Sequence, residues 1–165
     1  MTNSKLMQLS KQIGLVLKAK GETVTIAESC TGGWITKTIT DTAGSSAWFQ
    51  RGFITYSNEA KSQMINVRKE TILSHGPVSE PVIVEMAIGA LQAAKATYAL
   101  SVSGIAGPNN GSKVKPVGTV WFGLACVNGQ SIARFRRFQG NRDAVRRQAT
   151  VYALQFLWQQ FLQSS

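Results

Sequence analysis

The sequence is poor in the side chains that bind metal ions or form disulfide bridges. Its 165 residues include one histidine, His75, and two cysteines, Cys30 and Cys126. Three such residues, widely separated along the chain, do not make a tetrahedral zinc site. Two cysteines are also too few for the disulfide framework of a small secreted domain. The composition therefore excludes both of these ways of stabilising a fold.

Long apolar runs and a signal peptide are also missing. Residues 1–12 are polar and contain no apolar stretch of the kind that a signal peptide needs. The most apolar helical stretch, residues 81–94, is interrupted by Glu85 and Gln92 and is too short to span a bilayer. We therefore expect a cytoplasmic protein with no membrane partner.

Acidic side chains are scarce as well. Eight aspartates and glutamates stand against 18 lysines and arginines, which gives a net charge of +10. This excess favours an anionic partner, either a phosphate-bearing small molecule, a nucleic acid or an anionic membrane surface. Hydrophobic residues make up 44% of the chain and charged residues 16%, which excludes an intrinsically disordered protein. At this length we expect a single domain over residues 1–165.

Apolar spacing and turn residues predict helices that alternate with strands. Helices are expected over residues 3–20, 34–40, 58–64, 70–74, 80–96 and 142–162. Strands are expected over residues 23–27, 49–56, 98–102, 119–127 and 131–138. The last two strands flank Asn128-Gly129, a dipeptide typical of a hairpin turn in which both residues have positive φ. The pattern predicts an α/β layered domain with a mixed sheet, in which helices cover parallel strands and an antiparallel pair is added.

The first candidate site is the turn after the first strand, AESCTGG at residues 27–33. A hydroxyl there lies between the carboxyl end of a strand and the amino end of a helix, where backbone N–H groups favour negative charge. A nucleophile with an oxyanion site, or a phosphate cradle, would be built at such a place. The simpler interpretation is that Ser29 or Thr31 caps the helix. A thiolate nucleophile at Cys30 is a further alternative, although a buried, inert thiol is commoner.

A serine nucleophile needs a base, and Lys61 is the candidate because His75 lies in a different context. The pKa of a free lysine is about 10.4 and must fall before the amine can act as a base. Burial lowers it, and so does the positive end of a helix, such as the helix capped by Ser57 that carries Lys61. Tyr56, at the end of a strand, could hydrogen-bond to the pair. A solvated surface lysine is the simpler interpretation, since lysines are mostly exposed.

Two more segments could contribute to a binding site. The loop 103–118 begins with SGIAGP after a strand, and ligands of α/β sheets bind beyond the carboxyl ends of strands. Six of the eight arginines lie within residues 134–147, where Asp143 is the only acid. An arginine fork binds phosphate, and a cluster of arginines can bind nucleic acid. For most of the six, a solvated face is the simpler interpretation.

Four ordered motifs are similar to those of a known family. They are AESCTGG, GSSAWFQRGFITYSNEAK, SGIAGP followed by KPVGTVWFG, and GNRDAVRRQA. Over about residues 5–162 the chain resembles the CinA C-terminal-domain family, and within it the stand-alone nicotinamide-nucleotide amidohydrolases. The resemblance implies a three-layer α/β/α domain, a homo-oligomer, most simply a dimer, and no metal or cofactor. It also implies hydrolysis of nicotinamide mononucleotide to nicotinate mononucleotide and ammonia, a reaction of NAD recycling.

The resemblance carries roles over to particular residues. Ser29 corresponds to the nucleophile, Lys61 to its general base, and Tyr56 to a supporting residue. Substrate-binding residues are expected in the two glycine-bearing turns and the arginine motif, at Cys30, Thr31, Gly32, Gly33, Ser103, Gly104, Ala106, Gly107 and Arg142.

The chain departs from the family pattern after Gly107-Pro108. It has Asn109-Asn110-Gly111 where an acidic residue and paired glycines are expected, and the lysines Lys113 and Lys115 make this loop more basic. Two alternatives therefore stand beside the amidohydrolase. One is a paralog that binds the nucleotide with weak or no turnover, and the other is a basic module that binds nucleic acid.

Overall fold

The computed structural model describes residues 1–163. Within this range, five strands form one mixed sheet in the spatial order β2-β1-β3-β4-β5. β1 pairs in parallel with both β2 and β3, whereas β3, β4 and β5 pair antiparallel. The strands are β1 (Val24–Glu28), β2 (Gly52–Ile54), β3 (Tyr98–Gly104), β4 (Thr119–Cys126) and β5 (Ser131–Arg137).

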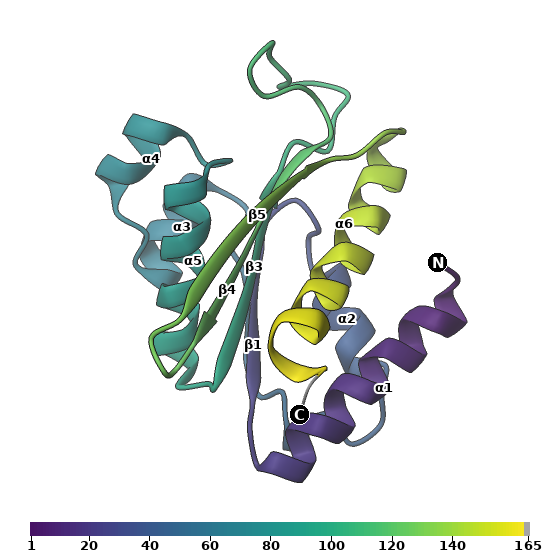
Figure 1. Cartoon of the computed structure of the whole chain (residues 1–165). Coiled ribbons are helices and arrows are strands. Elements are labelled where there is room, and N and C mark those ends of the chain that lie inside the picture. The colour runs from purple at the N-terminus through teal and green to yellow at the C-terminus, as the bar shows by residue number, and fades with distance from the viewer. Residues whose placement is uncertain (164–165) are drawn as a thin grey trace.

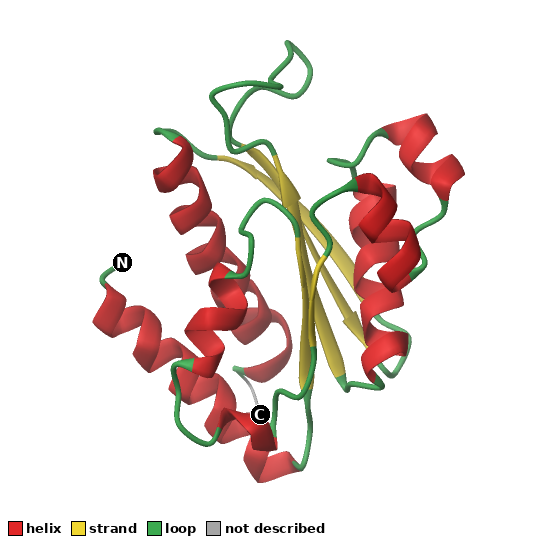
Figure 2. Cartoon of the chain, turned by 180° about the vertical axis from the view of Figure 1, so that it is seen from behind, coloured by secondary structure: helices red, strands yellow, loops and turns green. Residues whose placement is uncertain are grey.

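Helices cover both faces of this sheet (Figures 1 and 2). α3, α4 and α5 lie on one face, and α1, α2 and α6 lie on the other. The helices are α1 (Asn3–Lys20), α2 (Trp34–Thr40), α3 (Asn58–Ile65), α4 (Lys69–His75), α5 (Glu80–Ala94) and α6 (Arg142–Leu157). A 3₁₀ turn, Ser45–Ala47, precedes β2, and a π-helical turn, Trp158–Leu162, follows α6. The three-layer α/β/α fold with a mixed sheet is therefore confirmed.

The two faces of the sheet are packed with side chains of different size. Toward α1, α2 and α6, strands β3 and β4 present the large side chains Leu100, Val102, Val120, Phe122 and Leu124. Opposite α5 they carry Ala99, Ser101, Gly123 and Ala125, and Ser101 Oγ donates to the Ile83 carbonyl at 2.8 Å. A Cβ atom added to Gly123 would lie 2.8 Å from the same carbonyl oxygen. The small residues therefore let α5 pack directly against the backbone of the sheet.

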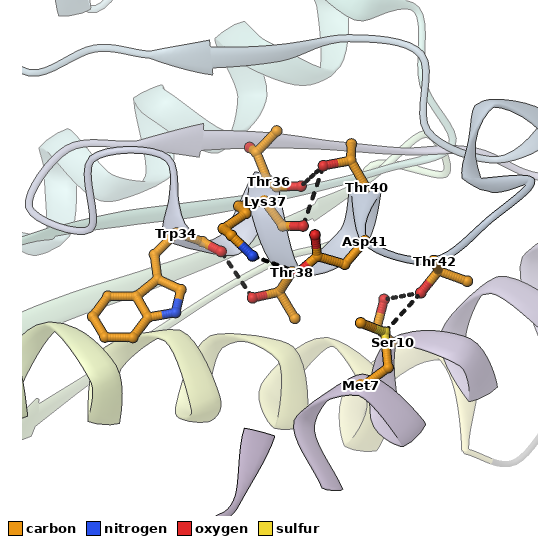
Figure 3. A network of polar contacts seen from close by, with 9 residues as sticks. All are labelled: Met7, Ser10, Trp34, Thr36, Lys37, Thr38, Thr40, Asp41 and Thr42. Carbon is orange, nitrogen blue, oxygen red and sulfur yellow. Dashed lines mark hydrogen bonds and ion pairs between the residues drawn. The ribbon is translucent and has the colours of Figure 1, made fainter. Parts of the chain in front are cut away.

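A set of polar contacts runs along α2 and joins the residue Thr42, just after it, to α1 (Figure 3). The hydroxyls of Ser10 and Thr42 lie 3.1 Å apart, which links α1 to the end of α2. Along α2, Lys37 forms an ion pair with Asp41 at 2.7 Å, and Thr38 Oγ1 donates to the Trp34 carbonyl. These contacts fix a seven-residue helix that is too short to be stable alone.

The hairpin between β4 and β5 differs from the prediction in its turn. Gly129 has a φ of 98°, but Asn128 is not among the residues with positive φ. The Cys126 N–H donates to the Gln130 carbonyl, and the Val127 N–H donates to Thr97 on the other side. The loop is therefore residues 127–129 with glycine in the left-handed region, the usual three-residue hairpin. The predicted two-residue turn is wrong, because the pairing of β4 between its two neighbours sets the register.

The predicted strand over residues 49–56 is shortened to Gly52–Ile54. Trp48 and Phe49 are buried, and the Trp48 carbonyl accepts from Val24 N–H at 3.0 Å. The apolar run before β2 is therefore a loop that fills the core. None of the helices in residues 1–163 is long and apolar enough to cross a membrane.

Candidate active site

The three parallel strands end at one edge of the sheet. Ser29 directly follows β1, Thr55 and Tyr56 follow β2, and Ser103 lies at the end of β3. β1 and β3 are neighbours, and the chain leaves them in opposite directions, toward β2 and toward β4. Such a switch in direction opens a crevice beyond the strand ends. A pocket of about 420 Å³ lies at this place.

The pocket is lined by residues from five segments of the sequence. The predicted site residues that line it are Ser29, Cys30, Tyr56, Lys61, Ser103, Gly104, Ala106, Gly107 and Arg142. Further lining residues, which the sequence did not single out as binding residues, are Asn58, Pro77, Val78, Ile105, Asn109, Asn110, Ser112 and Lys115. None of these lining residues is acidic, whereas Lys61, Lys115 and Arg142 are basic. The pocket is therefore suited to an anionic ligand.

The Nζ atom of Lys61 lies 3.1 Å from the Oγ atom of Ser29. Lys61 also donates to the carbonyls of Thr55 at 3.1 Å and Tyr56 at 3.2 Å. Ser29 Oγ lies 3.3 Å from the Tyr56 carbonyl. A neutral amine could keep both carbonyl bonds and accept the serine proton. The alternative of a solvated surface lysine is wrong, because Lys61 is 1% exposed.

Burial lowers the pKa of Lys61 to about 8. Removing an ammonium from water penalises its charged form, and within residues 1–163 no carboxylate lies close enough to form an ion pair with it. Lysine normally titrates far above neutral pH, so this shift gives a usable fraction of neutral amine near pH 8. A serine hydroxyl beside such an amine is the arrangement of a serine–lysine nucleophile.

Glu28 organises the turn that carries Ser29, a role that the sequence analysis did not recognise. This carboxylate is fully buried at the end of β1. Its oxygens accept from the backbone N–H groups of Gly33, Ile35 and Thr36 at the start of α2. They also accept from the hydroxyls of Thr31 and Thr36 at 2.6 and 2.7 Å. Five donors satisfy the charge and complement the positive helix end.

The glycine turn is therefore not the open anion site that we expected. α2 begins after Gly33, and no side chain of Ser29 or Thr31 caps it, since Glu28 takes that place. The Gly32 N–H donates to the Ser29 carbonyl. Thr31, Gly32 and Gly33 are also absent from the pocket lining. Among the backbone N–H groups of this turn, those of Gly32 and Gly33 already have acceptors.

Cys30 lines the pocket but is not prepared as a nucleophile. Cys30 is 5% exposed, and burial is the main cause that raises the pKa of its thiol to about 12. Its own backbone N–H and Arg146 lower the pKa, but by less. Thiolate is the reactive form, and it is almost absent at neutral pH for such a group. The structure therefore favours Ser29 over Cys30.

Tyr56 touches the pair through its backbone, not through its ring. Its hydroxyl lies 3.2 Å from the Nη2 atom of Arg142, and the side chain is 60% exposed. Arg142, the first residue of α6, also donates through Nη1 to the Gly107 carbonyl at 2.8 Å. Tyr56 and Arg142 thus join the segments after β2 and β3 across the pocket mouth.

The arginines of the cluster make different contacts, and Arg134, Arg136 and Arg137 are exposed on β5. Arg134 and Arg136 lie over the rings of Phe156 and Tyr152. Arg146 donates to backbone carbonyls of the nucleophile turn. These contacts place the arginines in several separate environments, and a nucleic-acid surface gains no support from them.

Comparison with known proteins places this geometry in a family. The model of the CinA C-terminal domain matches residues 6–161. The chain belongs to this family. It is 70% identical, over the whole length of both chains, to a protein of Escherichia coli K12 named nicotinamide-nucleotide amidohydrolase PncC. A protein of the same name from Enterobacter agglomerans is 55% identical over 99% of this chain and all of its own.

Solved structures of CinA proteins share the fold. A CinA superfamily protein of Klebsiella pneumoniae has a TM-score of 0.91 at 37% identity, covering 97% of this chain and 99% of its own. The competence/damage inducible protein CihA of Agrobacterium tumefaciens has a TM-score of 0.90 at 40% identity, covering 92% and 93%.

Proposed function

We propose that this chain hydrolyses the carboxamide of nicotinamide mononucleotide to nicotinate mononucleotide and ammonia. The observation that carries the proposal is the contact between Lys61 Nζ and Ser29 Oγ, 3.1 Å long, in the wall of the basic pocket. The full-length similarity to proteins named nicotinamide-nucleotide amidohydrolase supports the choice of substrate. The phosphate of that substrate suits a pocket that is also lined by Lys115 and Arg142.

The first half of the reaction forms an ester with the protein. Ser29 Oγ attacks the carboxamide carbon while neutral Lys61 takes the hydroxyl proton. The new O–C bond forms as the carbonyl electron pair moves onto the oxygen, which becomes an oxyanion. When the carbonyl reforms, the C–N bond breaks, and Lys61 returns its proton to the departing nitrogen. Ammonia leaves, and Ser29 carries the nicotinoyl group as an ester.

The second half releases the acid. Lys61 is neutral again and takes a proton from a water molecule that attacks the ester carbon. The tetrahedral intermediate collapses, the bond from carbon to Ser29 Oγ breaks, and Lys61 protonates the leaving Oγ. Nicotinate mononucleotide dissociates. Every proton that Lys61 accepts is therefore given up again within the cycle.

Arg142 is the residue that we assign to the nucleotide phosphate. It stands at the amino end of α6, next to the loop 103–118, and its guanidinium is held by Gly107 and Tyr56. A guanidinium held in this way is pre-oriented for a phosphate, which it can bind through two parallel bonds. Ser103, Gly104 and Ala106 line the same pocket as Arg142 and Ser29.

We also propose the setting that the family resemblance implies. The enzyme acts in the cytoplasm, in the recycling of NAD, as a homo-oligomer, most simply a dimer. A partly exposed aromatic pair supports a surface for association between subunits. Phe135 on β5 is 53% exposed, and its ring centroid lies 5.1 Å from that of Trp121. Sedimentation equilibrium would test the oligomeric state, and a monomer at all concentrations would contradict it.

The deciding experiment measures ammonia release from nicotinamide mononucleotide without added metal. Wild type is compared with Ser29→Ala and Lys61→Ala, and with Lys69→Ala as a control at an exposed lysine. We expect wild type and the control to turn over, and both site variants to lose at least about 10³-fold in kcat. If folded wild type releases no ammonia but binds the nucleotide saturably, the chain is a binding protein and the proposal is wrong.

A further inference from the structure

One arginine reaches the nucleophile turn from behind. Arg146, in the second turn of α6, donates from Nε to the Cys30 carbonyl at 3.0 Å and from Nη2 to the Thr31 carbonyl at 3.3 Å. Its guanidinium also lies 6.0 Å from the ring centroid of Trp34. Arg146 does not line the pocket, so any effect on the reaction must pass through the backbone of the turn.

The two carbonyls that accept from Arg146 are connected to two backbone N–H groups without an oxygen acceptor, one directly and one through a further hydrogen bond. The Cys30 carbonyl belongs to the same peptide group as the Thr31 N–H. The Thr31 carbonyl belongs to the peptide group of the Gly32 N–H, which donates to the Ser29 carbonyl at 3.1 Å. That carbonyl in turn shares a peptide group with the Cys30 N–H. Within residues 1–163, neither the Cys30 nor the Thr31 N–H donates to an oxygen.

We propose that Arg146 is a positioning residue that polarises the Cys30 amide through the Thr31 carbonyl, the Gly32 N–H and the Ser29 carbonyl, so that this amide binds the oxyanion formed when Ser29 attacks. The inference rests on the proposed amidohydrolase function. A carbonyl that accepts from a cation withdraws electron density from its peptide nitrogen, and hydrogen-bonded chains strengthen one another in this way. The N–H of the residue after a nucleophile is a common oxyanion donor, and Cys30 lines the pocket in that position.

Gly32 explains how the guanidinium comes so close. A Cβ atom on this residue would lie 3.0 Å from Nη2 of Arg146, and its φ of 59° disfavours other side chains. Glu28 holds the same turn from the opposite side through Thr31 and Gly33. The turn is therefore fixed before substrate binds, and preorganised donors are the ones that stabilise a transition state most.

The test compares Arg146→Gln and Arg146→Lys with wild type, using Arg147→Gln as the matched control. Arg147 is adjacent on α6 but donates to the Met1 carbonyl, away from the pocket. Removing one oxyanion donor costs about 10²–10³ in kcat, so weakening the Cys30 donor in Arg146→Gln is expected to lower kcat by roughly 10–100-fold. KM is expected to stay within about threefold, because the oxyanion exists only after attack. Arg146→Lys keeps the charge but loses the planar guanidinium, so its kcat should lie between those of wild type and Arg146→Gln.

The pH profile of the rate shows whether the loss in Arg146→Gln comes from weaker polarisation of the amide or from a displaced Ser29. Arg146 is not among the groups that shift the pKa of Lys61, so the acidic limb of the rate profile should stay in place in Arg146→Gln while its plateau falls. A kcat within threefold of wild type would overturn the inference, and so would a raised KM with unchanged kcat or a displaced limb. If Arg146→Gln does not fold, the same criteria apply to Arg146→Lys with an expected loss of at least about fivefold. If wild type itself releases no ammonia, both this inference and the proposed function fail.

Discussion

Lys61 donates to Ser29 Oγ across 3.1 Å, although the two residues are 32 positions apart in the sequence. The contact exists because β1 and β2 are parallel neighbours whose carboxyl ends coincide, and α3 starts shortly after β2. The same arrangement points the lysine at the carbonyls of Thr55 and Tyr56. The chemistry of the site therefore depends on the pairing of two strands, one of which has only three residues.

The activity should depend on pH through Lys61. Burial lowers its pKa to about 8, and only the neutral amine can accept the serine proton. At pH 7 about a tenth of the molecules carry the neutral amine, so kcat/KM should rise about tenfold per pH unit below pH 8 and level off above it. Measuring kcat/KM from pH 6 to 9.5 would show this, because kcat/KM reports the pKa of the free enzyme. A flat profile would contradict the role of Lys61 as base.

Stability should show the same titration. The pKa of Lys61 is about 8 in the folded protein and close to 10.4 when unfolded, so between these values the unfolded state binds more protons. The free energy of unfolding should therefore rise with pH across this window, relative to Lys61→Met, which cannot titrate there. Urea unfolding of both proteins at pH 7.5, 9 and 10.5 measures the difference. A gap independent of pH would mean that Lys61 titrates normally.

Replacing Glu28 with glutamine should destabilise the protein. The amide keeps the shape of the carboxylate, but one of its two oxygens becomes an NH₂ group. That NH₂ group, a donor, would face N–H and hydroxyl groups that are donors too. Such a mismatch costs roughly 1–3 kcal/mol in the free energy of unfolding. The exposed Glu59→Gln is the control and should change it by less than about 0.5 kcal/mol. Equal stability of the two variants would show that Glu28 does not hold the turn.

Removing the thiol should leave the reaction largely intact. Burial raises the pKa of Cys30 to about 12, which leaves almost no thiolate for attack. Cys30→Ala is therefore expected to keep kcat within about threefold, while Ser29→Ala loses it. Loss of ammonia release in folded Cys30→Ala would reopen the thiol mechanism.

Arg142 should discriminate between ligands with and without a phosphate. A charge-assisted hydrogen bond contributes about 1.5–3 kcal/mol, so Arg142→Gln should weaken inhibition by nicotinate mononucleotide roughly 10–100-fold. Inhibition by nicotinate riboside, which lacks the phosphate, should be weaker in wild type and nearly unchanged by the substitution. A parallel loss for both ligands would place the phosphate elsewhere, with Lys115 as the next residue to test.

Secondary structure was predictable wherever neighbouring residues encode it. The hydroxyl of Ser57 caps α3, as predicted, by accepting from the N–H three residues further along. The side-chain oxygen of Asn141 caps α6 in the same way. The hairpin turn was not predictable in detail, because the register of β4 is set by both of its neighbours. The cap of α2 was also missed, since its acceptor is a carboxylate five residues before its first donor.

By itself, the sequence determined the local elements, the basic balance and the motifs that carry the family resemblance. These depend on periodicity, capping and residue type, all of which are local properties. The tertiary structure alone decided that Lys61 is buried beside Ser29, that Glu28 holds the start of α2, and that Arg146 contacts the turn. The physical reason is that burial, hydrogen-bond partners and the resulting pKa shifts depend on which distant segments pack together.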